Sequence, residues 1–221
     1  MTKAESETPF TDKIEAWGES GSFFPSLIPD AHSQIALRSI QRQIHNQFPE
    51  SKPVKHLHST IFYSRPRLVY DYLKDKVNPD VKKPYLYSDL TSNFFAIWTS
   101  APNFFELPVE SLEKFGRDND IIAVKLGRTA AYRVWSNMAR DLFSRTLRSH
   151  GVLDDDLEAM RSMPEFEWSL GESTPHVSLL TDAENGDLPS IKLPDTIRFD
   201  SLSDGKVDIG GEDPLRFYLG L

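Results

Sequence analysis

Two short segments, one in each half of the chain, constrain the fold most strongly. Residues 57–63 read Leu-His-Ser-Thr-Ile-Phe-Tyr, and residues 175–180 read Pro-His-Val-Ser-Leu-Leu. Each segment places a histidine two positions before a hydroxyl residue, at the start of an apolar run typical of a β-strand. Because side chains alternate between the two faces of a strand, His58 shares a face with Thr60, and His176 shares a face with Ser178. The pattern predicts two strands that bring two imidazoles and two hydroxyls to one site.

Such a site is suited to the cleavage of a phosphodiester. In a ribonucleotide linkage the neighbouring 2′-hydroxyl attacks phosphorus, a neutral imidazole takes its proton, and an imidazolium protonates the leaving 5′-oxygen. Histidine serves both roles because its unperturbed pKa is about 6.5. The hydroxyls of Thr60 and Ser178 donate hydrogen bonds to the non-bridging oxygens, where negative charge develops. We therefore predict a phosphodiesterase without metal or cofactor, in which one histidine is the base and the other is the acid. The assignment depends on how the substrate lies; for a 3′-5′ linkage the preferred one has His58 as base and His176 as acid.

Each of these sequence features can also occur in a protein without a catalytic site. A single His-x-Ser or His-x-Thr in a strand is more often a core histidine bonded to a backbone carbonyl. The pair His56 and His58 places two imidazoles on one strand face, but no nearby residue completes a zinc site. Residues 154–156, three consecutive aspartates, indicate a solvated acidic loop rather than a cation site. The remaining histidines lack a hydroxyl two positions on: His32, His45, His56 and His150.

Composition limits the class of ligand. The 221 residues are 39% hydrophobic and 26% charged, which is typical of a globular protein with a core. The net charge of −8 argues against a long nucleic acid as ligand and favours a small nucleotide. No apolar run approaches the ~20 residues of a membrane span, the polar N-terminus does not resemble a signal peptide, and the absence of cysteine suits the cytoplasm.

The pattern along the chain predicts an α+β fold. We expect a flexible arm over residues 1–21 and a single bilobal domain over residues 22–221. Predicted strands cover residues 22–28, 58–63, 94–98, 121–126, 176–180, 197–199, 206–209 and 216–219. Predicted helices cover residues 31–48, 68–76 and 130–150, with a Pro- and Lys-rich loop through residue 84. One histidine motif in each half of this order suggests two similar lobes around a central cleft.

Three stretches resemble the 2H phosphoesterase superfamily, and within it the phage anti-CBASS nucleases, which degrade cyclic oligonucleotide signals of bacterial immunity. Residues 57–65 resemble the His-x-Thr strand of that family with its Tyr-Ser-Arg ending. Residues 174–179 resemble its Pro-His-x-Thr strand, with serine in place of threonine. Residues 209–212, Ile-Gly-Gly-Glu, resemble its C-terminal Gly-Glu strand. The resemblance implies two lobes of antiparallel sheet with flanking helices.

The same resemblance implies a substrate and further site residues. The substrate is a cyclic di- or trinucleotide, cleaved at its 3′-5′ bonds in the cytoplasm of a bacterial host. Phe23 corresponds to an aromatic residue that packs on the ligand, Trp98 lies in a strand that contains tryptophan, and Glu212 contacts a base; Tyr63 is the fourth expected nucleotide contact. Extra material relative to the family lies at residues 77–92, 102–120 and 153–173.

Two other functions fit the same motifs. One is an RNA 2′,3′-cyclic phosphodiesterase or a 2′-5′ oligonucleotide hydrolase, which a basic face beside the cleft would favour. The other is a protein that sequesters cyclic nucleotides without cleaving them, in which the histidines only bind.

Overall fold

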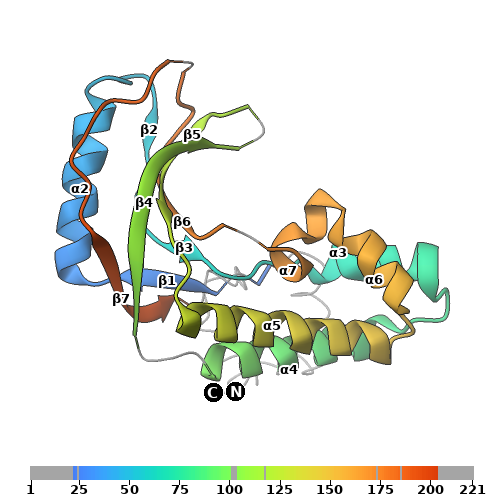
Figure 1. Ribbon diagram of the computed structural model, residues 1–221. Coiled ribbons are helices and arrows are strands. Elements are labelled where there is room, and N and C mark those ends of the chain that lie inside the picture. The colour runs from blue at the N-terminus through green and yellow to red at the C-terminus, as the bar shows by residue number, and fades with distance from the viewer. Residues whose placement is uncertain are drawn as a thin grey trace, which may run out of the picture.

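The computed structural model describes residues 22–203, apart from residues 24, 101–103, 117, 173 and 185. Within these residues the fold is α+β, with one antiparallel sheet and two sets of helices (Figure 1). The strands are β1 (Ser26–Pro29), β2 (Lys52–Pro53), β3 (Ser59–Thr60), β4 (Phe105–Phe115), β5 (Ile121–Leu126), β6 (His176–Thr181) and β7 (Thr196–Ser203). The helices are α2 (Ala31–His45), α3 (Pro66–Tyr72), α4 (Lys83–Thr99), α5 (Ala130–Ser149), α6 (Asp154–Arg161) and α7 (Glu167–Leu170), with a π turn at Leu73–Val77 and a 3-10 turn at Pro164–Phe166.

The sheet has the strand order β2-β6-β5-β4-β7-β1-β3. The long strand β4 joins its two halves, because residues 105–108 pair with β7 and the rest of the strand pairs with β5. The β4–β5 hairpin curls strongly, and α2 lies on the other side of the sheet from α3, α6 and α7 (Figure 1). The curl brings β3 into contact with β6, although the two strands belong to different halves of the sheet.

Helix α2 confirms the helix predicted from residue 31. The carboxylate of Asp30 accepts a hydrogen bond from the Ser33 amide at 2.7 Å and caps the helix. Leu37, Ile40 and Ile44 are buried against the sheet, as the spacing predicts. Ile35, expected on the same stripe, is instead 70% exposed.

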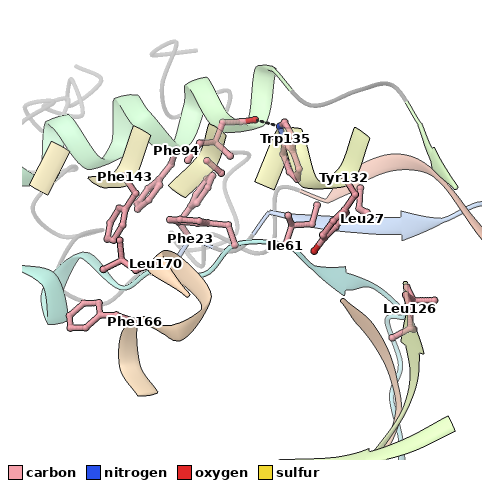
Figure 2. Close-up of a cluster of buried hydrophobic side chains, with 14 of the residues drawn as sticks. Phe23, Leu27, Ile61, Phe94, Leu126, Tyr132, Trp135, Phe143, Phe166 and Leu170 are labelled. Carbon is pink, nitrogen blue, oxygen red and sulfur yellow. Dashed lines mark hydrogen bonds between the residues drawn. The ribbon is translucent and has the colours of Figure 1, made fainter. Parts of the chain in front are cut away.

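Helix α5 also lies where predicted, with a different buried face. Val134 is 71% exposed, and the buried face of the helix carries the aromatic residues together with Ala139 and Leu147. Figure 2 shows three of them, Tyr132, Trp135 and Phe143, in the cluster between helix and sheet. The helix ends at Gly151, whose φ of +99° allows the Val152 amide to bond the Leu147 carbonyl at 3.2 Å.

Three predictions of secondary structure were wrong. Residues 94–98 are the end of helix α4 and not a strand; the helix begins at Lys83, and Pro84 fits its first turn, where no amide donor is needed. Residues 154–156 form the first turn of α6 and not a loop, because three carboxylates favour the positive end of a helix. No strand was predicted within residues 102–120, which contain the central strand β4.

Other predictions were right in position and wrong in extent. The strands at β5 and β6 are confirmed, whereas the strand expected at residues 58–63 is regular only over β3. Its continuation is a single bridge between Phe23 and Ser64. The strand expected at residues 22–28 begins after Pro25 and runs through Pro29, where a bulge interrupts its pairing with β7. Strands expected at 206–209 and 216–219 lie outside the described residues, as does the arm at 1–21.

Candidate functional site

The two histidine motifs have the same local structure. His58 immediately precedes β3, and His176 is the first residue of β6. In each, the Nδ1–H of the ring donates to the carbonyl two residues earlier, His58 to His56 and His176 to Thr174, at 2.9 Å in both cases. A backbone carbonyl only accepts, so each bond fixes the tautomer with the proton on Nδ1. The Nε2 atom of each ring is then left to accept a proton or, in the imidazolium, to donate one.

The sheet brings the two motifs close together. Strand β3 contacts β6, and the charge of His58 acts on the ring of His176. Burial lowers the pKa of His176 below the usual 6.5; the hydrogen bond to Thr174 opposes this effect, and His58 adds to it. His176 is therefore mainly neutral at pH 7.

A cavity of about 290 Å³ opens beside these strands, lined by Thr60, Tyr63, Trp168 and His176. Thr60 is half-buried while its neighbour Ser59 is fully buried, so the threonine is the one that faces the cavity. Its Oγ1 lies 3.5 Å from Oγ of Ser26 on β1. The alternation of β6 confirms that Ser178 shares the half-buried face of His176, between the buried Val177 and Leu179.

Two aromatic rings hold the imidazole of His176. Phe115, at the end of the curled hairpin strand β4, stacks on it with centroids 4.5 Å apart and planes 17° from parallel. Trp168 on α7 meets it edge to face at 5.6 Å. These contacts exclude water from the ring and explain why burial dominates its pKa.

Tyr63 also lines the cavity and is held by two contacts. The hydroxyl of Ser169 on α7 donates to the Tyr63 carbonyl at 2.7 Å, which ties this residue to the helix that carries Trp168. Arg65 lies over the Tyr63 ring, and its Nε donates to the Tyr63 hydroxyl. The cavity therefore has a tyrosine and a tryptophan as walls, and a threonine and a histidine as polar groups.

The chain is similar to solved structures of phosphoesterases. It resembles E. coli LigT complexed with 3′-AMP, with a TM-score of 0.47 and 14% identity over 81% of this chain and 82% of that one. It also resembles a protein described as a phosphoesterase, with a TM-score of 0.45 and 15% identity over 81% of this chain and 84% of that one. No family model and no curated protein matches the sequence. At these TM-scores and identities, the likenesses assign neither a family nor an activity.

One of the expected nucleotide contacts, Phe23, is not brought to the cavity. Phe23 is 8% exposed and stacks on Phe94 of α4, with centroids 4.2 Å apart, so its ring lies in the core (Figure 2). Its partner across the bridge is Ser64, whose side chain faces away from that of Tyr63. Trp98 lies in the last turn of α4 and not at a strand end. Glu212 lies outside the described residues.

Sequence reasoning missed Trp168 and Phe115. Both belong to segments that we interpreted as added material, and neither stands in a periodic pattern that would mark it. The sequence feature that could have indicated this wall is the pair Trp168-Ser169, which precedes the second histidine motif. Ser169 bonds α7 to the Tyr63 carbonyl, and Trp168 contacts the ring of His176.

No cluster of three or more histidine, aspartate or glutamate side chains suited to a metal occurs among the described residues. His56 and His58 gain no third ligand there. Within the same residues, every helix is too short or too polar to span a bilayer.

Proposed function

We propose that this chain is a phosphodiesterase that cleaves 3′-5′ ribonucleotide linkages with two imidazoles as acid and base. The observation that carries the proposal is the matched pair of Nδ1–H bonds to backbone carbonyls, which leaves two Nε2 atoms for chemistry on strands that touch. Thr60 lines the cavity together with His176, and in the proposed mechanism its hydroxyl donates to a non-bridging phosphate oxygen.

The pKa of His176 favours a definite division of roles. A general base must be neutral to accept a proton, and burial keeps His176 neutral at pH 7. His176 then takes the proton of the attacking 2′-hydroxyl, and His58 protonates the leaving 5′-oxygen. This assignment reverses the one that we inferred from the sequence, which could not show that the two rings differ in burial.

We propose further that the substrate is a cyclic di- or trinucleotide of the kind used as an immune signal, so that cleavage would help a phage evade that immunity. Support comes from the motif resemblance at residues 57–65 and 174–179 and from a small cavity walled by Tyr63 and Trp168, suited to one nucleoside. The net charge of −8 disfavours a long nucleic acid.

The test is a chromatographic cleavage assay with EDTA present throughout. The purified chain is incubated with 3′,3′- and 2′,3′-cyclic dinucleotides, a cyclic trinucleotide, a 2′-5′ oligonucleotide, and an RNA ending in a 2′,3′-cyclic phosphate. We expect ring opening, reduced by ~10²-fold or more in His58→Ala and in His176→Ala. His32→Ala is the matched control, because His32 is exposed on the first turn of α2.

Each alternative gives a different result. Action on the RNA end or the 2′-5′ oligonucleotide alone would make the chain an RNA-processing enzyme. Tight binding of the rings without turnover would make it a sequestering protein. A loss of less than tenfold in both histidine variants would contradict the acid–base scheme.

A further inference from the structure

A second cavity, of about 240 Å³, adjoins the candidate site. Its lining includes three cationic side chains, Lys125, Arg128 and Arg133, and one carboxylate, Glu110. Two further carboxylates, Glu113 and Glu172, lie against Lys125 and Arg128, which leaves Arg133 as the cation of the lining without a paired carboxylate among the described residues.

The second cavity and the first share the strand that carries His176. Lys125 on β5 is the direct partner of His176 across the antiparallel pair, so the two side chains stand side by side on one face. Thr174, which lines the second cavity, supplies the carbonyl that holds the His176 ring at 2.9 Å. Thr174 and His176 are two residues apart, which is about 7 Å along an extended chain and roughly the length of one nucleoside.

Neighbouring carboxylates hold two of the cations in place. Nη1 of Arg128 donates to Oε2 of Glu172 at 2.8 Å, and its Nη2 donates to the Glu172 carbonyl at 3.1 Å. Lys125 donates to Glu113 at 3.2 Å and lies 3.7 Å from Glu110. These bonds fix the cations before any ligand arrives, which reduces the entropy lost on binding.

Arg133 is the most available of the three cations. It stands in the first turn of α5, is exposed, and forms no ion pair with any residue that the structure describes. A planar guanidinium binds two oxygens of a phosphate through two parallel N–H donors, a geometry that a lysine cannot offer.

We propose that this second cavity binds another phosphate group of the same substrate, one nucleotide away from the phosphate between the histidines. The inference rests on the proposed function, because it defines the neighbouring phosphate by that site. It favours substrates with phosphates on successive nucleotides, such as cyclic dinucleotides. Cyclic mononucleotides, which have a single phosphate, would not use this cavity.

The test is the binding of short probes to the full-length His58→Ala variant, which is expected not to turn them over. Calorimetry at fixed salt compares the dinucleoside monophosphate ApA with pApA and ApAp, which carry one additional terminal phosphate. We expect at least one of the two-phosphate probes to bind about tenfold more tightly than ApA. Arg133→Gln, added to the same background, should remove most of this ratio, and Arg128→Gln should do the same.

Arg145→Gln is the matched control, because Arg145 is exposed on the same helix and does not line the cavity. Thermal unfolding followed by circular dichroism shows whether each variant remains folded, and Arg133→Gln keeps the test decisive if loss of the Arg128–Glu172 pair disturbs the fold. Equal binding of all three probes, or an unchanged ratio in Arg133→Gln, would overturn the inference.

The two proposals fail separately. Ring opening by the wild type together with equal binding of ApA, pApA and ApAp would leave the proposed function standing without the second phosphate site. A phosphate-dependent ratio that Arg133→Gln removes, in a chain that cleaves nothing, would leave a binding site without the activity.

Discussion

The two histidines carry the same bond to the backbone but differ in their surroundings. His176 is enclosed by Phe115 and Trp168, whereas nothing comparable encloses His58 among the described contacts. An identical tautomer in two environments is an economical way to obtain an acid and a base from one residue type. In the proposed mechanism, the aromatic enclosure, rather than the His-x-Ser/Thr pattern, therefore distinguishes the two roles.

The pH dependence of cleavage should report this enclosure. The folded pKa of His176 lies below 6.5, so its neutral form persists as pH falls through 6.5 and is lost only at the lower folded value. We expect the acidic limb of the kcat/KM profile to lie below pH 6.5 and to move to higher pH in Phe115→Ala, which admits water to the ring.

The lowered pKa of His176 also affects the stability of the fold. As pH falls below 6.5 the unfolded chain takes up the proton first, so His176 lowers the free energy of unfolding.

The measurement is a pH–rate profile together with an NMR titration of the His176 ring. Phe104→Ala serves as control, because Phe104 is 59% exposed and makes its described ring contact with Arg198. An acidic limb at or above pH 6.5 in the wild type would assign the base to another group.

Trp168 should contribute to substrate binding more than to the chemical step. Stacking of a base on an aromatic ring is worth about 1–3 kcal/mol, so Trp168→Ala should raise KM by about tenfold. We expect kcat to change less, because the indole approaches His176 edge to face without a hydrogen bond. Steady-state kinetics of Trp168→Ala beside Trp168→Phe checks this, since phenylalanine keeps a stacking face. A fall in kcat with KM unchanged would contradict a binding role.

At the scale of elements, the spacing of apolar residues was enough to predict an element that buries one of its faces. Helix α2 and strands β5 and β6 follow their apolar spacing, and Gly151 ends α5 as its sequence position suggests. Helix α4 was missed because its consecutive aromatic residues imitate a buried strand. Its real signal is a helical stripe across the whole element, with Leu86, Leu90, Phe94 and Ile97 buried.

Strand β4 was missed for a different reason. Its first residues alternate clearly, with Phe105 and Leu107 buried and Glu106 exposed, but Pro108 interrupts the pattern. The proline is tolerated because it stands where β4 changes its pairing from β7 to β5. That exchange of partners is a property of the sheet and leaves no mark in a single sequence.

Gln41 is a buried polar residue of α2 that attaches the helix to the sheet. Its buried side-chain amide donates to the Leu179 carbonyl on β6 at 2.7 Å and to the Val54 carbonyl at 3.0 Å. Gln41→Ala leaves two carbonyls without this donor, so we expect a loss of about 1–3 kcal/mol in the free energy of unfolding. Urea denaturation measures it. Gln43→Ala, on the exposed face of the same helix, should change it by less than about 0.5 kcal/mol.

At the scale of the whole molecule, the candidate site depends on the curl of the sheet, which brings the two halves of the sheet together. The first histidine motif belongs to the half formed with β7 and β1, and the second to the half formed with β5 and β2. Strand β4 joins the halves, and the curl of the sheet places β3 against β6 (Figure 1). The sequence therefore predicts two residues that line the cavity, Thr60 and His176, but not the wall residue Trp168 or the ring of Phe115, whose places depend on the curl.

The distribution of charge over the molecule should limit the length of nucleic acid that binds. The three cations of the second cavity lie in one small region, whereas the whole chain has a net charge of −8. We therefore expect nucleotides beyond the first two to be repelled by the protein. The affinity of the His58→Ala variant should therefore not increase from a dinucleotide with two phosphates to an RNA of about 20 nucleotides. Two phosphate contacts on a single strand predict a slope of about −1.4 in log affinity against log salt concentration. Fluorescence anisotropy over a series of lengths and salt concentrations measures both quantities. Affinity that rises steadily with length, with a slope beyond about −3, would reveal an extended basic track and direct the search for substrates to RNA.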